Sequence, residues 1–148
     1  DCSDIDLVVL PKREPVKDLF DQITGYQVIP EFVAMVNTWT KVRGEPTGKY
    51  TQRLLPDGHK LELSIATKEN WGNLVLIRTG SAEFNQKIMT AAHKRDMQQR
   101  DGYLYKDEKM IPLYEEIQYF QVLHLPYVEP ENRNEDSYRH HHFSFGRL

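Results

Sequence analysis

Hydrophobic and polar positions alternate near the start of the chain in the pattern of a β-strand. Asp4 and Asp6 lead into an apolar run over residues 7–10. Because successive side chains of a strand point to opposite faces, the two carboxylates share one face. We therefore expect a strand whose leading end presents both carboxylates together.

A second alternating stretch predicts a hairpin. Residues 50–55 and 59–66 flank a Pro-Asp-Gly sequence, which is typical of a tight turn between strands. In the second arm the apolar side chains face one way, whereas Glu62 faces the other. If this arm pairs with the first strand, Glu62 completes a cluster of three carboxylates; otherwise it is an exposed strand residue.

Apolar residues at positions 16, 19, 20 and 23 have helical spacing, with Pro15 suited to the first turn and Gly25 to the end. This pattern predicts a helix that covers the sheet. Residues 29–39 also fit a helix, but Pro30 and the short length leave a strand open.

The second half of the chain predicts a smaller mixed unit. Apolar spacing indicates a helix over residues 82–95 and a short helix around residues 117–123, which Pro126 ends. Between them, residues 103–105 and 110–113 resemble the arms of a small hairpin.

The carboxylates suggest magnesium chemistry. Two oxygen ligands on a rigid strand suit Mg²⁺, which keeps several waters and recruits substrate phosphates. An Asp-x-Asp pair alone is equally typical of turns and strand ends, so its interpretation depends on the rest of the sequence.

Two further motifs supply that context. Thr79-Gly80-Ser81 precedes the predicted helix, and Leu125-Pro126-Tyr127-Val128-Glu129-Pro130 lies near the end of the chain. Together with the carboxylates, over roughly residues 2–133, they resemble the family X DNA polymerases, the DNA polymerase beta and lambda group. The resemblance implies an α+β fold: a nucleotidyltransferase-type palm sheet with a covering helix, followed by a small α+β thumb subdomain. The partial palm would span residues 1–68, the thumb 69–133 and a tail 134–148.

The resemblance also implies a function, a DNA-directed DNA polymerase that fills gaps during repair. Two Mg²⁺ ions, with Mn²⁺ as the alternative, would be held by Asp4, Asp6 and Glu62, which are also the catalytic residues. The expected partners are gapped or primer-template DNA and a dNTP, with an rNTP as the alternative. The nucleotide-binding residues would be Arg78, Gly80, Ser81, Ala82 and Asn85. The nucleic-acid-binding residues would be Lys60, Lys87, Lys94 and Arg95.

Several departures from the family pattern affect this expectation. Glu62 stands where the family has Asp, Ile77-Arg78 replaces an aromatic pair, and Met89 replaces an Arg that follows template contacts. The family's Gly-Ser motif would precede Asp1, so we expect a further N-terminal segment to be required. Two alternatives therefore stay open: a template-independent nucleotidyltransferase and a non-catalytic nucleic-acid- or protein-binding remnant.

Composition adds limits. The chain has 148 residues, 39% of them hydrophobic, and a formal net charge of -3, so we expect weak DNA binding unless its charges are segregated. The single Cys2 excludes an internal disulfide and favours a reducing, cytoplasmic or nuclear compartment. No apolar run predicts a membrane span. Three adjacent histidines at 140–142 are expected to lie in a solvated tail and not in a zinc site.

Overall fold

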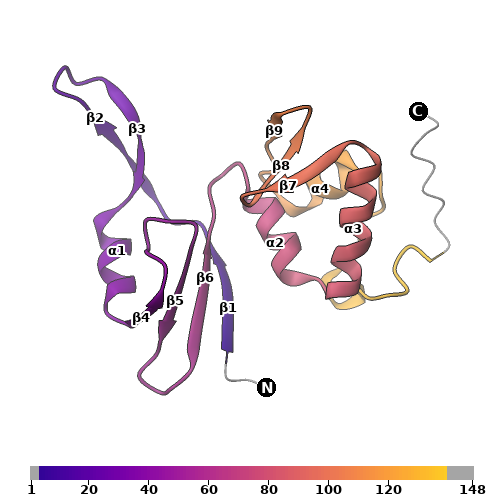
Figure 1. Ribbon diagram of the computed structural model, residues 1–148, viewed down its shortest axis with the longest axis horizontal. Coiled ribbons are helices and arrows are strands. Elements are labelled where there is room, and N and C mark those ends of the chain that lie inside the picture. Colours follow the sequence, from indigo (N-terminus) through magenta and orange to yellow (C-terminus); the bar gives the residue numbers. More distant parts are fainter. Residues whose placement is uncertain (1–3, 140–148) are drawn as a thin grey trace. The chain divides into compact units, whose positions relative to one another are not determined.

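The computed structural model describes residues 4–139, and the chain divides into two compact units, Asp1–Thr67 and Lys68–Leu148 (Figure 1). Each unit has its own hydrophobic core. The predictions about Cys2 and the three histidines lie outside the described residues. Within residues 4–139, no helix has the length and apolar character needed to cross a bilayer.

The first unit is built on a four-stranded sheet in the order β1-β6-β5-β4. The strands are β1 (Asp4–Val9), β4 (Thr40–Arg43), β5 (Tyr50–Leu54) and β6 (Lys60–Ile65). β1 is parallel to β6, whereas the other pairs are antiparallel. The predicted strand and hairpin are therefore confirmed, and β6 does pair with the first strand.

Helix α1 (Pro30–Asn37) packs on the apolar face of this sheet. Val36 of the helix lies in one buried cluster with Leu61, Leu63 and Ile65 of β6. Pro30 occupies the start of the helix, where its missing N–H costs nothing. The ambiguity over residues 29–39 is thus resolved in favour of a helix.

The predicted helix between Pro15 and Gly25 is wrong. These residues form an antiparallel hairpin of β2 (Arg13–Lys17) and β3 (Ile23–Val28). The carboxylate of Asp18 accepts hydrogen bonds from the backbone N–H groups of Phe20 (2.8 Å) and Gln22 (3.0 Å), which stabilises a turn where the helix was expected. The apolar positions have helical spacing, but they are not buried against a core.

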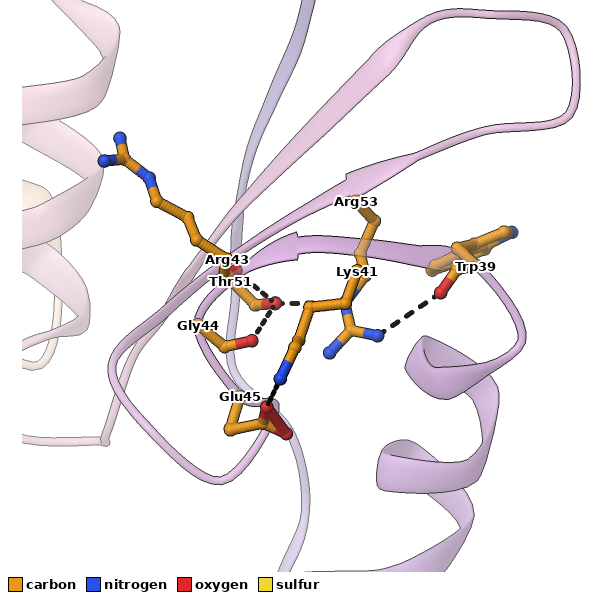
Figure 2. A network of polar contacts seen from close by, with 7 residues as sticks. All are labelled: Trp39, Lys41, Arg43, Gly44, Glu45, Thr51 and Arg53. Carbon is orange, nitrogen blue, oxygen red and sulfur yellow. Dashed lines mark hydrogen bonds and ion pairs between the residues drawn. The ribbon is translucent and has the colours of Figure 1, made fainter.

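A buried polar network lies on the face of the sheet that packs against α1 (Figure 2). Arg53 is 2% exposed. Its Nε donates to Thr51 Oγ1 (3.0 Å), and its Nη1 donates to the backbone oxygen of Trp39 (3.3 Å). The Thr51 hydroxyl donates in turn to the Gly44 carbonyl oxygen (3.0 Å). These bonds tie the loop between β4 and β5 to the sheet.

The same loop is closed on its outer side by an ion pair between Lys41 and Glu45, with 2.6 Å between Nζ and Oε2 (Figure 2). The hydrogen bond and charge of Lys41 lower the pKa of the Glu45 carboxyl below its ordinary value. Both side chains are exposed, so this pair contributes little stability, and the buried Arg53 bonds carry more of the loop's order. The loop leads directly into Tyr50, the first residue of β5.

Up to residue 139, the second unit contains three α-helices, a three-stranded sheet and a 3₁₀ turn. Its buried core is formed chiefly by Leu76, Phe84, Ile88, Leu104, Tyr119 and Phe120. The predicted helices and hairpin are confirmed, whereas α2 and β7 were not predicted. In chain order the elements are α2 (Trp71–Thr79), α3 (Ala82–Lys94), β7 (Met97–Arg100), β8 (Tyr103–Lys106), β9 (Lys109–Ile111), α4 (Glu116–Val122) and η1 (Pro130–Asn132).

Candidate functional site

The parallel register of β1 and β6 brings two of the candidate carboxylates side by side. Asp6 is the direct partner of Glu62, and Asp4 is the direct partner of Lys60. Directly paired residues point to the same face, so all four side chains share the face opposite the apolar core. Asp4 and Asp6 are exposed and Glu62 is half-buried. The face is therefore polar and largely open to solvent.

Charge makes this face a candidate cation site. Like charges directly opposite each other on neighbouring strands repel, which applies to Asp6 and Glu62. Lys60 lies beside Asp4 and offsets part of the negative charge at that end. A divalent cation between Asp6 and Glu62 would remove the remaining repulsion, and oxygen-only ligands suit Mg²⁺.

The described part of the chain does not gather three carboxylates into one group. Among residues 4–139, no set of three or more His, Cys, Asp or Glu side chains is placed to hold a metal ion together. The structure brings Asp6 and Glu62 to neighbouring positions, and Asp4 lies on the same face two residues before Asp6 on β1. The donors fit an ion that takes the rest of its ligands from water and substrate.

Tyr50 is a residue of this face that the sequence did not single out. Its hydroxyl donates a hydrogen bond to the Glu62 carboxylate. Burial first, and then this bond to Glu62, raises the pKa of the Tyr50 hydroxyl above its ordinary value. The guanidinium of Arg43 lies 5.5 Å from the centre of the Tyr50 ring. Tyr50 therefore orients Glu62 and is itself held by a cation on its ring.

The hairpin pattern contained a signal for this contact. Tyr50 pairs with Ser64, two residues along the strand from Glu62. Side chains in that diagonal relation are within reach of an aromatic residue. The strand parity of the predicted hairpin, combined with its register, places Tyr50 on the carboxylate face.

The predicted nucleotide-binding turn lies in the second unit, between α2 and α3. Ser81 precedes α3, and its Oγ accepts a hydrogen bond from the backbone N–H of Phe84 (3.1 Å), so it caps the helix. A side chain at Gly80 would place its Cβ 2.9 Å from Asn85 Oδ1 and 3.1 Å from the Phe84 ring. A larger residue at this position would therefore have to displace the side chain of Asn85 or Phe84.

The side chains around this turn differ in how free they are to meet a ligand. Asn85 donates from Nδ2 to the backbone oxygen of Ile77 (2.7 Å), so its amide group joins α3 to the end of α2. Ala82 and Arg78 are exposed, at the start of α3 and in the last turn of α2 respectively. Arg78, the cation among the predicted nucleotide-binding residues, is thus accessible to solvent.

The four predicted nucleic-acid-binding cations are distributed over both units. Lys60 is exposed at the start of β6. In the second unit Lys94 is exposed and Arg95 is half-buried, both at the end of α3. Lys87 already donates from Nζ to the backbone oxygen of Ser137 (2.6 Å), so contact with a phosphate would require that bond to break.

An open groove of about 560 Å³ runs between α3 and β7. Met89 lies in it, with Gln86, Thr90 and His93 from α3 and Gln98 from β7. The position where the resembled family carries an Arg therefore forms part of a groove with amide, hydroxyl and thioether groups.

One buried cation anchors the second unit. Arg133 has a fully buried side chain and forms an ion pair with Glu116, with 2.6 Å between Nη1 and Oε2. Its Nε donates to the backbone oxygen of Val128 (2.9 Å). The guanidinium lies 5.5 Å from the ring centre of Phe84 and 5.4 Å from that of Phe120. Arg133 thereby joins the segment that follows α4 to α3 and α4.

Part of this second unit is similar to a known protein family. Residues 74–134 match the family described as DNA polymerase beta thumb. No curated protein matches the chain by sequence. The match includes the Gly80-Ser81 turn, α3 and the segment that carries Arg133.

Two solved structures of Leishmania infantum polymerase beta are similar to the chain. Its ternary gap complex has 19% sequence identity and a TM-score of 0.54, over 70% of this chain and 47% of that one. Its ternary P/T complex has 18% identity and a TM-score of 0.56, over 88% of this chain and 60% of that one. At such low identity the likeness is one of fold.

The mixed α and β architecture therefore includes a polymerase beta-type thumb. Residues 74–134 match the DNA polymerase beta thumb family, and the resemblance to the family X DNA polymerases is confirmed. The chain spans 47% and 60% of the length of the two polymerase chains it resembles.

Proposed function

We propose that the chain acts in DNA-directed nucleotidyl transfer of the family X type, adding a nucleotide to a primer 3′-hydroxyl during gap filling. The observation that supports this most is the register that places Asp6 beside Glu62, with Asp4 on the same face, in a chain with a polymerase beta-type thumb. The polymerase structures it resembles are described as gap and P/T complexes, which supports DNA as the partner.

In this proposal each residue of the carboxylate face has a defined task. Asp4, Asp6 and Glu62 would hold two Mg²⁺ ions, or Mn²⁺, which lower the pKa of the attacking hydroxyl and neutralise the triphosphate. Glu62 is one methylene longer than the family's Asp, and the hydrogen bond from the Tyr50 hydroxyl restricts the movement of its carboxylate. Lys60 supplies a positive charge beside Asp4 for a phosphate.

The thumb residues would contact the nucleotide. Gly80 and Ser81 would form the tight turn against the sugar, with Ala82 and Asn85 beside the base. Arg78 would offer a donor to a ribose hydroxyl or a phosphate because it is exposed and planar. Lys87, Lys94 and Arg95 would face the DNA backbone.

Template-independent transfer is the second candidate. Met89 favours it, because this position in the groove beside α3 lacks the cation that follows template contacts in the family. A non-catalytic binding role is the third outcome that an activity assay would reveal.

Primer extension distinguishes these functions. We expect insertion of one matched dNTP on a gapped duplex in Mg²⁺, with slower insertion on a single-stranded primer and with the corresponding rNTP. Faster extension of the single-stranded primer, without preference for the matched base, would establish template-independent transfer. The absence of extension in both Mg²⁺ and Mn²⁺, with DNA binding retained, would support a binding role of this chain alone.

Tyr50→Phe tests the positioning of Glu62. We expect turnover to fall by roughly 10- to 100-fold with little change in KM for the nucleotide. The lost hydrogen bond orients the carboxylate of Glu62, which is a proposed metal ligand. The control is Tyr105→Phe, which removes a hydroxyl from β8 in the other unit. Equal turnover in Tyr50→Phe and the wild type would show that Glu62 is oriented without this bond.

A further inference from the structure

The β2–β3 hairpin contributes no residue to the hydrophobic cluster of the first unit. It forms a two-stranded sheet of its own and extends away from the four-stranded sheet in Figure 1. Leu19 is 100% exposed and Phe20 83% exposed at its tip, and Tyr26 is 66% exposed on β3. Large apolar side chains gathered on one exposed element mark an interaction surface.

The register of the hairpin gives its two faces different chemistry. On β2, Arg13 and Lys17 lie on one face, and the partner of Pro15 between them is Tyr26. The opposite face carries Glu14 and its partner Gln27, and Gln27 Nε2 lies 3.5 Å from Glu14 Oε1. Arg13, Lys17 and the ring of Tyr26 thus share one face, and Glu14 lies on the other.

The two aspartates of the tip are engaged within the hairpin. Asp18 accepts the backbone N–H groups of Phe20 and Gln22, as described above. Asp21 forms an ion pair with Lys17, with 3.3 Å between Oδ1 and Nζ. Because both partners of that pair are exposed, the pair is weak, and Lys17 can exchange it for a phosphate.

We propose that this face of the hairpin binds single-stranded nucleic acid. Tyr26 on this face and Phe20 at the adjoining tip stack on unpaired bases, and Arg13 and Lys17 contact the phosphates. Aromatic rings on a ribbon with adjacent cations are the combination that single-strand binding proteins use without reading sequence. The two cations favour this ligand over an apolar protein surface, because Glu14 lies on the other face and a phosphate would replace Asp21 as the partner of Lys17.

Two phosphate contacts also predict the salt dependence. For a single strand, each neutralised phosphate contributes about 0.7 to the slope of log K against log salt concentration, so the hairpin accounts for a slope of roughly −1.4. Lys17→Gln should reduce the measured slope by about 0.7.

The test is fluorescence anisotropy of a labelled oligothymidylate of about 16 nucleotides, the upper end of common single-strand site sizes. The full chain is used in EDTA without a nucleotide, so the result does not depend on metal binding or on the proposed transfer reaction. We expect Tyr26→Ala and Phe20→Ala each to weaken binding by at least about fivefold. Tyr26→Phe should retain affinity because the ring remains.

Gln27→Ala is the matched control, since it removes an exposed side chain next to Tyr26 from the opposite face. Equal affinity of the wild type, Tyr26→Ala and Phe20→Ala would overturn the proposal, as would an equal loss in Gln27→Ala. So would a dimer in sedimentation that Phe20→Ala dissociates without changing DNA affinity, because the face would then join two copies. Loss of primer extension with normal oligothymidylate binding would count against the proposed function alone.

Discussion

Asp6→Asn is expected to abolish nucleotide transfer while the fold remains intact. Asp6 lies directly beside Glu62 and on the same face as Asp4, so it is the central carboxylate of the three. Losing one charged ligand removes several kcal/mol of charge stabilisation at the reacting phosphate, which corresponds to on the order of 10³-fold in rate. Single-nucleotide insertion on a gapped duplex measures this loss.

The same substitution separates catalysis from stability. Removing one of two repelling carboxylates relieves electrostatic strain, so the midpoint of urea unfolding should stay level or rise slightly. Glu31→Gln is the control, because it neutralises an exposed acid on α1 of the same unit. Turnover of Asp6→Asn within a factor of a few of wild type would rule out the carboxylate face as the site.

Local patterns predicted the elements that are buried on one face. The alternation over residues 50–66 and the helical spacing over residues 82–95 both correspond to real burial against a core. Leu19, Phe20 and Ile23 of the β2–β3 hairpin have helical spacing too, yet they are exposed. Periodicity reports burial only when a core exists to bury the periodic face, and sequence alone does not show where the core is.

The candidate site shows the same division. Strand parity predicted that Asp4 and Asp6 share a face, and the pairing of β1 with β6 confirmed that Glu62 joins it. The internal bonds of Asn85 and Lys87 were not predictable, because each joins side chains to backbone atoms that are distant in sequence or lie in another element. Tyr50 differs from them, because the register of the predicted hairpin places it on the carboxylate face, diagonal to Glu62.

Glu116→Ala is expected to destabilise the second unit by roughly 3–5 kcal/mol, the usual cost of leaving a buried charge without its partner. The side chain of Arg133 has no solvent exposure, and Glu116 is its carboxylate partner at 2.6 Å. Burial by itself lowers the pKa of Arg133, but the hydrogen bond and charge of Glu116 outweigh burial and raise it. The substitution removes that support, but a guanidinium is too basic to lose its proton near neutral pH. It must therefore be buried as an unpaired charge or expelled from between Phe84 and Phe120.

Urea unfolding, together with hydrogen exchange of the amides of α3 and α4, measures this loss and locates it. Glu108→Ala is the matched control, because Glu108 pairs with Arg100 at 3.4 Å on the surface, and an exposed pair is worth about 0–1 kcal/mol. The double variant Glu116→Ala/Arg133→Met should recover much of the lost stability, since it removes the buried charge together with its partner. A loss for Glu116→Ala no larger than that for Glu108→Ala would mean that the aromatic rings and the Val128 carbonyl hold the guanidinium without the ion pair.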